Sequence, residues 1–199
     1  MSELQREVRY CALAPFELRE AAGDQINVTG YAAVFGEAAD IGPLDSWGWS
    51  EVVERGAFSA ALQRGDDVTF LINHRDLPLA RTTSGTLTLT EDERGLRVDT
   101  ALDASDPDVM RILPKMRRGD LSKMSFAFEA EKETWDETGA HALRTIQSVR
   151  LYDVSIVTDP AYEGTDIGLR SKQLALGGGV DLHRRQMQMQ MRMRLASGS

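Results

Sequence analysis

Short runs of alternating apolar and polar residues constrain the fold of this chain more than any other feature. The strictest run is TLTLT at residues 86–90, and LRVDTAL (96–102) and MSFAFEAE (124–131) share its period of two. Successive side chains of a β-strand point to opposite faces, so this period predicts half-buried strands rather than helices. Because the runs are short and close together, they predict strands that return locally and pair antiparallel.

The remaining elements complete a predicted α+β fold of mostly antiparallel strands. GAFSAALQRG predicts a short helix that ends at Gly65, and DPDVMRILPKMRRGD predicts a helix with Asp106 as N-cap and Gly119 beyond its end. About seven strands with two helices make too many local returns for a parallel βαβ sheet. We expect a closed or partly open β-barrel, or a sandwich, with flanking helices. The predicted strands are 25–34, 68–73, 86–90, 96–102, 124–131, 143–150 and 151–158, with a loop over 37–50.

The composition is that of a folded domain with neither a membrane span nor a secretory leader. Hydrophobic residues make up 42% and charged residues 27%, as in ordinary soluble domains. No apolar run approaches the roughly 18 residues that cross a bilayer, and MSELQREVRY has no apolar leader segment. Cys11 is the only cysteine, which excludes an internal disulfide and favours a reducing cytoplasm. The acidic residues are too scattered to predict a metal site, and no cofactor is expected.

Charge is distributed unevenly along the 199 residues. Residues 171–199 contain five basic residues and one acidic residue, a net of +4, which leaves a net of −12 in residues 1–170. An acidic body repels phosphates, so nucleic acid is not expected as a partner. The tail also contains GGG and the low-complexity run QMQMQMRMR. We therefore divide the chain into an N-terminal arm (1–24), one domain (25–170) and a flexible basic tail (171–199).

His74 is one of only three histidines and directly follows a predicted apolar strand. A strand end lets a side chain face a cleft while the backbone stays rigid. His74 is therefore either a core histidine or a catalytic base. His141 lies in a predicted turn and His183 in the tail, where surface roles are expected.

Ser125 stands among large apolar residues in a predicted strand. The period of two places it on the face opposite Met124, Phe126 and Phe128. The three large side chains would then pack in the core, and the serine would project from the other face. It is either a nucleophile or a strand serine that hydrogen-bonds a neighbour. The chain has no G-x-S-x-G run, so the α/β-hydrolase signature is absent.

Asp153 interrupts the apolar run LYDVSIVT. A carboxylate in a half-buried strand costs free energy unless it is paired. A histidine N–H is a natural partner, and an ion pair with Arg150 or another base is the alternative. Together, His74, Ser125 and Asp153 supply the base, nucleophile and orienting acid of a serine-protease triad.

Six strings, in order over residues 28–170, resemble the motifs of tailed-phage prohead maturation proteases. They are VTGYAAVFG, EVVERGAFSAAL, VTFLINHR, SGTLTLTEDERGLRVDTAL, MRRGDLSKMSFAFEAEKETW and VRLYDVSIVTDPAYEGT. These proteases cut scaffold and capsid proteins inside an assembling procapsid, and they are distantly similar in fold to herpesvirus assemblin proteases. The family's Asn-His-acid motif falls on His74, and its Ser-Phe-x-Phe strand falls on Ser125.

The sequence departs from the family's pattern at two positions. Arg75 follows the histidine where an acid is usual, with Asp76 next, and Asp153 stands where glutamate is more usual. In assemblins the third role belongs to a second histidine. Neither His141 nor His183 lies in the matching strand, so the resemblance favours Asp153 for the third role.

The resemblance implies a serine endopeptidase that cleaves the scaffold protein, the major capsid protein and itself during procapsid maturation. Residues 25–170 would be the protease domain, with an assemblin-like barrel. The enzyme would act inside the procapsid in the host cytoplasm, with no membrane partner, and a homo-oligomer is left open. The alternative is a catalytically silent scaffold or assembly protein of the same fold. A third reading is a small β-barrel binding module whose basic tail recruits acidic partners.

Overall fold

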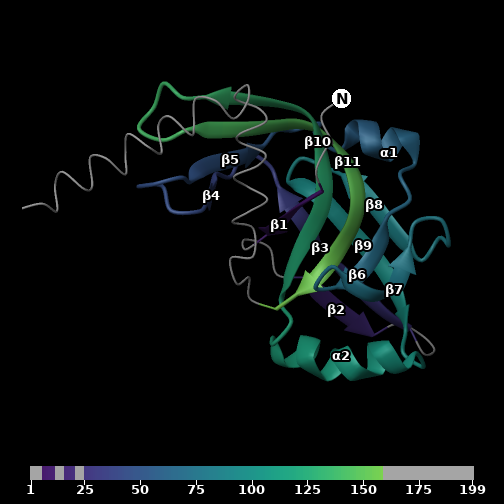
Figure 1. The fold of residues 1–199 in the computed structure, drawn as a ribbon. Coiled ribbons are helices and arrows are strands. Elements are labelled where there is room, and N and C mark those ends of the chain that lie inside the picture. The colour runs from purple at the N-terminus through teal and green to yellow at the C-terminus, as the bar shows by residue number, and fades with distance from the viewer. Residues whose placement is uncertain (1–5, 12–15, 21–24, 159–199) are drawn as a thin grey trace, which may run out of the picture.

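The computed structural model describes residues 6–11, 16–20 and 25–158, whose strands form two β-sheets with two helices beside them (Figure 1). The seven-stranded sheet contains β1 (Glu7–Cys11), β4 (Ala39–Ile41), β5 (Trp49–Val53), β6 (Thr69–Ile72), β7 (Arg75–Arg81), β10 (Lys123–Asp136) and β11 (Leu143–Val157). The four-stranded sheet contains β2 (Glu17–Glu20), β3 (Gln25–Val34), β8 (Leu87–Glu91) and β9 (Gly95–Asp103). The helices are α1 (Ser59–Arg64) and α2 (Pro107–Arg118).

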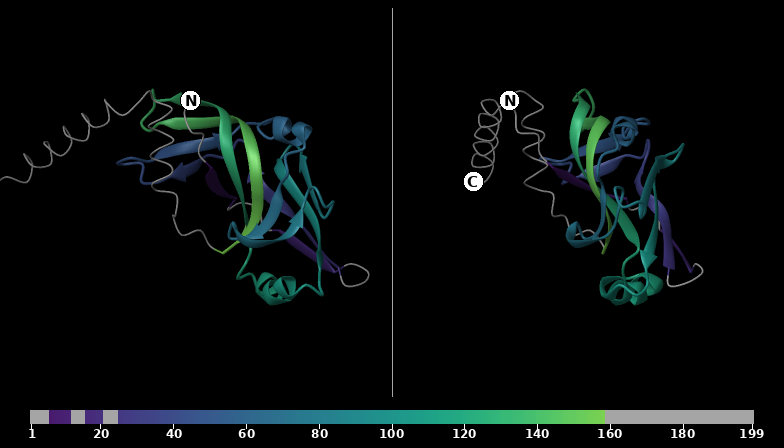
Figure 2. Two further views of the ribbon diagram at one scale, coloured as in Figure 1. Left: turned by 45° about the vertical axis from the view of Figure 1, so that its right-hand side comes forward. Right: turned by 90° about the vertical axis from the view of Figure 1, so that its right-hand side faces the viewer.

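The long hairpin of β10 and β11 organises the larger sheet. Its strand order is β1–β10–β11–β5–β4, and β6 pairs with both β11 and β7. β11 pairs antiparallel with β10, parallel with β5 near its own start, and parallel with β6 near its end. The smaller sheet follows the order β2–β3–β9–β8, and all its pairings are antiparallel. Figure 2 shows the two sheets as separate layers, with α2 across one end.

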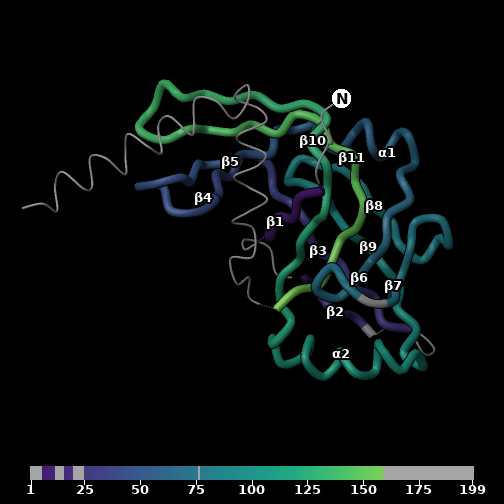
Figure 3. Tube along the Cα trace, viewed as in Figure 1, coloured from purple at the N-terminus to yellow at the C-terminus, as the bar shows by residue number. Residues whose placement is uncertain are grey.

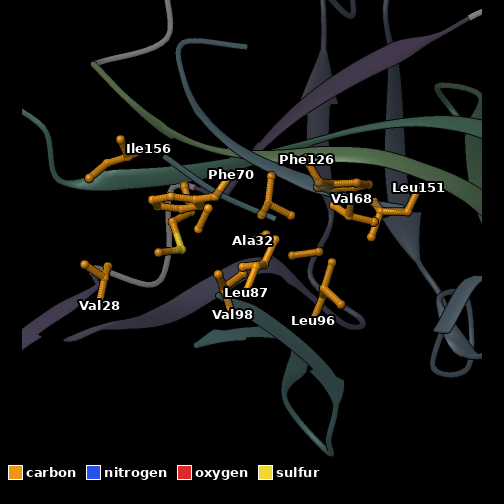
Figure 4. Packing of buried hydrophobic residues seen from close by; sticks show 14 of the residues in the cluster. Val28, Ala32, Val68, Phe70, Leu87, Leu96, Val98, Phe126, Leu151 and Ile156 are labelled. Atoms are coloured by element: carbon orange, nitrogen blue, oxygen red, sulfur yellow. The ribbon is translucent and has the colours of Figure 1, made fainter. Parts of the chain in front are cut away.

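The hydrophobic core fills the space between these layers. Figure 4 shows Val28, Leu96 and Val98 of the smaller sheet facing Phe126 and other apolar side chains of the larger one. Met124, Phe126 and Phe128 all belong to this core, as the period of two in MSFAFEAE predicts. The packing therefore fixes which face of β10 turns inward, and with it the direction of Ser125.

Both predicted helices are present, with the predicted ends. The Asp106 side chain accepts a hydrogen bond from the backbone N–H of Asp108, and Pro107 is the first helical residue of α2. Gly119 ends α2 with φ of 84°, and Gly65 ends α1 with φ of 68°. Glycine adopts this left-handed conformation without the steric cost that a Cβ brings.

The mostly antiparallel fold class is confirmed, but the strand count was too low. The strands β1, β2, β4, β5 and β7 are not among the predicted ones, and β4 and the first two residues of β5 lie in the predicted loop (37–50). The two strands predicted at 143–150 and 151–158 are one strand, β11. Ala127 of β10 pairs with Asp153, but the next residue, Phe128, pairs with Leu151. Tyr152 is therefore an extra, bulged residue of β11 that interrupts the alternation of its side chains.

The barrel and the domain boundaries remain predictions. No closed barrel is found among the strands of the described residues. Within the predicted arm (1–24), β1 pairs with β10 and β2 pairs with β3. The predicted basic tail (171–199) lies outside the described residues.

A buried network of charged side chains joins β1, β5, β10 and β11. Arg144 of β11 is only 1% exposed, and it donates hydrogen bonds to Glu7 (2.7 Å), Glu51 (2.9 Å) and Glu133. Arg9 donates to both Glu7 and Glu51. Burial alone raises the pKa of the Glu51 carboxyl, but the guanidinium groups of Arg9 and Arg144 outweigh it and lower that pKa. The network therefore holds β1 against the rest of the sheet.

Replacing Arg144 by methionine should strongly destabilise the fold. The substitution leaves Glu7 and Glu51 buried with Arg9 as their remaining cation, and breaking a buried ion pair costs about 3–5 kcal/mol. Urea denaturation measures the free energy of unfolding. The matched control is Arg97→Met, because Arg97 pairs with Asp99 at the surface, where a pair contributes about 0–1 kcal/mol. Equal stabilities of the two variants would show that the network does not hold the sheet together.

Candidate active site

His74 lies in the tight turn between β6 and β7. Figure 3 traces these two strands. Ile72 pairs with Arg75, so Asn73 and His74 form a two-residue loop, with φ of 49° and 58°. Two positive φ angles are typical of the type I′ hairpin turn, which asparagine tolerates well and histidine less so. These are the only non-glycine residues of the described chain with positive φ. Such strain persists only where surrounding contacts hold it.

Contacts with β11 hold this turn. The backbone N–H of His74 donates to Ser155 Oγ at 3.1 Å, and that of Asn73 donates to the carbonyl of Ile156 at 3.0 Å. The Asn73 side-chain oxygen accepts from the backbone N–H of Thr158. These contacts fix the His74 backbone, and with it the imidazole, relative to β11. The His74 side chain is 11% exposed.

Strand pairing brings the other two predicted residues to the same place. β11 lies between β10 and β6, and Ser155 pairs with Ser125 on one side and with Leu71 on the other. Asp153 stands two residues before Ser155, so both point to the same face of β11. Ser125 and Asp153 are 0% and 1% exposed.

The three side chains form a continuous chain of short contacts. His74 Nε2 lies 2.5 Å from Ser125 Oγ, and His74 Nδ1 lies 2.5 Å from Asp153 Oδ1. The structure therefore brings together all three residues that the sequence analysis singled out. His141 is exposed and lies in the loop between β10 and β11.

Three further groups contact these side chains, and the sequence analysis did not find them. Ser155 Oγ donates to Asp153 Oδ1 at 3.1 Å and lies 3.2 Å from His74 Nδ1. The Arg6 guanidinium bonds to Asp153 Oδ2, so the ion pair considered for Asp153 exists, with Arg6 and not with Arg150. The Arg9 carbonyl accepts a hydrogen bond from Ser125 Oγ at 2.8 Å. Of the three, only Ser155 could have been predicted from the sequence. It stands two residues after Asp153 in one predicted strand, so both side chains point to the same face.

This arrangement of hydroxyl, imidazole and carboxylate is the one that serine hydrolases use to activate a serine. Serine hydrolases use a hydroxyl next to an imidazole that a carboxylate orients, so that the imidazole takes the hydroxyl proton during attack on a carbonyl. The described residues include no group of three or more His, Cys, Asp or Glu side chains that could hold a metal ion. Neither of the two described helices is long and apolar enough to cross a membrane.

Comparison with known families places the chain among such proteins. Residues 14–177 match the family of caudovirus prohead serine proteases, and this protein belongs to that family. Membership implies a capsid maturation protease. No curated protein and no solved structure matches the chain significantly.

Ser155→Ala should lower kcat about 10- to 100-fold with little change in KM. A hydrogen bond to a charged group contributes about 1.5–3 kcal/mol, and Ser155 acts on Asp153 and His74 rather than on the substrate. Peptide-cleavage kinetics measure both constants. Ser155→Thr, which keeps the hydroxyl, should recover part of the loss, and Ser148→Ala, elsewhere in β11, should be unaffected. If Ser155→Ala raises KM and leaves kcat alone, Ser155 is not a positioning residue.

Proposed function

We propose that this protein is a serine endopeptidase that cleaves the scaffold protein, the major capsid protein and itself during procapsid maturation. Ser125 is the nucleophile, His74 the general base and Asp153 the orienting acid. The observation that carries the proposal is the pair of 2.5 Å contacts that join these residues in a member of the prohead serine protease family. The proposed place of action is the interior of the assembling procapsid in the host cytoplasm.

Catalysis would begin with proton transfer from Ser125 Oγ to His74 Nε2 as Oγ attacks the scissile carbonyl carbon. His74 would then deliver that proton to the departing amine, leaving an acyl group on Ser125. Water would attack the acyl group with His74 again as base. Asp153 would hold the proton on Nδ1, so that Nε2 faces the serine as an acceptor.

Asp153 is well placed for this role because both oxygens of its carboxylate contact neighbouring side chains. Oδ1 faces His74 Nδ1 and the Ser155 hydroxyl, and Oδ2 faces the Arg6 guanidinium. Asp153 is 1% exposed, and a buried carboxylate costs free energy unless it is paired. The Ser155 hydroxyl binds the same carboxylate oxygen that faces the histidine, and so helps to orient Asp153 toward it.

Ser125→Ala and His74→Ala should each abolish processing of the capsid and scaffold proteins, and the double variant should be no worse. Loss of a triad serine or histidine typically costs on the order of 10⁴–10⁶ in kcat, because the residues act as a unit. Mass spectrometry after co-expression with both proteins detects the cleaved termini. The controls are Ser105→Ala and His141→Ala, which change exposed residues.

The same experiment separates the enzyme from a silent assembly protein of the same fold. A silent protein would leave its partners uncleaved in the wild type as well as in the variants. Cleavage at wild-type rates by Ser125→Ala would show that the nucleophile is another residue.

Asp153→Asn should reduce kcat by on the order of 10⁴ while the protein stays folded. The amide can donate to Nδ1 and so favours the tautomer that turns an N–H toward Ser125, which blocks proton transfer. The comparison variant is Asp136→Asn, which changes an exposed aspartate and should retain full activity. If Asp153→Asn is fully active and Asp76→Asn is not, the third role belongs to Asp76.

A further inference from the structure

The proposed nucleophile is covered by the N-terminal strand of its own chain. Ser125 is 0% exposed. β1 pairs antiparallel with β10, and Tyr10 stands directly opposite Ser125. The Tyr10 ring lies edge-on to the His74 ring at 6.3 Å, and the Arg9 carbonyl lies 2.8 Å from Ser125 Oγ. A substrate carbonyl cannot reach Oγ while β1 stays in this position.

The Arg9 carbonyl also competes with His74 for the serine proton. A hydroxyl has one proton, so Ser125 cannot donate to the Arg9 oxygen and to His74 Nε2 at once. The structure has Ser125 Oγ donating to Arg9. While this hydrogen bond lasts, Nε2 cannot act as the base toward Oγ. The contact therefore holds the site in an inactive arrangement.

The same segment reaches the other end of the site. Arg6, just before β1, binds Asp153 Oδ2 while Oδ1 faces the histidine. Arg6, Val8 and Tyr10 alternate with Glu7 and Arg9, so the first set faces the site and the second faces the buried charged network. The segment from Arg6 to Tyr10 thus lies along the site as an extended peptide, with the carbonyl of Arg9 at the nucleophile.

We propose that β1 occupies the substrate's place: an extended segment of the substrate displaces it and pairs antiparallel with β10 along residues 124–128. This inference rests on the proposed function, because it assigns the peptide-binding edge of that same site. An added strand gains affinity from backbone hydrogen bonds and specificity from alternate side chains. The register of β1 predicts that the residue in the place of Arg9 presents the scissile carbonyl.

Two features allow β1 to leave. Among the described strands, β1 pairs with β10 alone, so it forms an edge of the sheet. Glu7 and Arg9 depart together, which removes one negative and one positive charge from the buried network. Arg144 then keeps its hydrogen bonds to Glu51 and Glu133. Arg144 is therefore not left as a buried cation without a carboxylate. An unpaired buried charge is what makes breaking a buried ion pair costly.

A disulfide that locks β1 to β10 tests the proposal. Cys11, the only cysteine, stands directly opposite Met124, so Met124→Cys creates a facing pair across the two strands. The probe is a diphenyl phosphonate that carries the sequence Arg-Glu-Val-Arg of residues 6–9, with phosphorus in place of the Arg9 carbonyl carbon. Ser125 Oγ bonds to phosphorus and phenol leaves, which marks the serine permanently.

The oxidised variant should react with this probe at least ~10-fold more slowly than the same protein after reduction, because reactivity follows the fraction of molecules with β1 displaced. Met124→Ala is the matched control; it loses the same core side chain and should be indifferent to reductant. Equal rates in the oxidised and reduced forms would overturn the proposal and leave the proposed function standing. Failure of the wild type to cleave capsid protein would instead overturn the proposed function. A wild type that cleaves capsid protein but does not react with the probe would overturn the proposed register of β1.

Hydrogen exchange on the wild-type protein gives a second test that needs no core substitution. Attachment of the peptidyl phosphonate should remove protection from the backbone amides of β1 and leave those of the β8–β9 hairpin unchanged. A small fluorophosphonate without a peptide is the control and should disturb β1 less. If β1 stays protected with the peptide attached to Ser125, the peptide binds elsewhere and the proposal is wrong.

Discussion

The position of β11 between β10 and β6 is the constraint on which the candidate site depends. An antiparallel pairing on one side and a parallel pairing on the other place Ser125, Asp153 and the turn with His74 on three adjacent strands. Each strand is held by core side chains on its inner face, so the polar side chains of the outer face have little freedom. His74 stands 51 residues before Ser125 and 79 residues before Asp153 in the sequence, and its two ring nitrogens therefore reach hydrogen-bonding distance of both side chains.

Two groups of charged side chains include β1 or Arg6, the residue just before it. Arg144, Glu7 and Glu51 fix the outer part of the sheet, while Arg6 and Asp153 lie at the candidate site. Buried charges cost free energy unless paired, so both groups favour β1 in its observed register. The strand thus stabilises the sheet and covers the proposed nucleophile at once. Under the proposed function, a peptide that is to be cut would have to compete with the enzyme's own strand.

The sequence carried enough information for the fold class and for the three candidate residues, for identifiable physical reasons. Strict alternation predicts the β8–β9 hairpin and the inward face of β10, and capping residues predict both helices. Alternation fails where the backbone departs from regular pairing, as at the Tyr152 bulge, and where a strand has only three residues, as in β4. It also fails where a charged side chain is buried, as Glu51 is in β5. The roles of Arg6, Arg9 and Ser155 depend on strand order and register, and the Arg9 contact involves a backbone carbonyl that any residue could supply.

The most direct measurement of the central claim is the site of covalent attachment of a fluorophosphonate, read by tandem mass spectrometry of the digested protein. The account predicts a single adduct, on Ser125, that disappears in His74→Ala because Oγ then has no base. An adduct on another serine, or none in a preparation that cleaves capsid protein, would contradict the account, since a different group would then perform the attack.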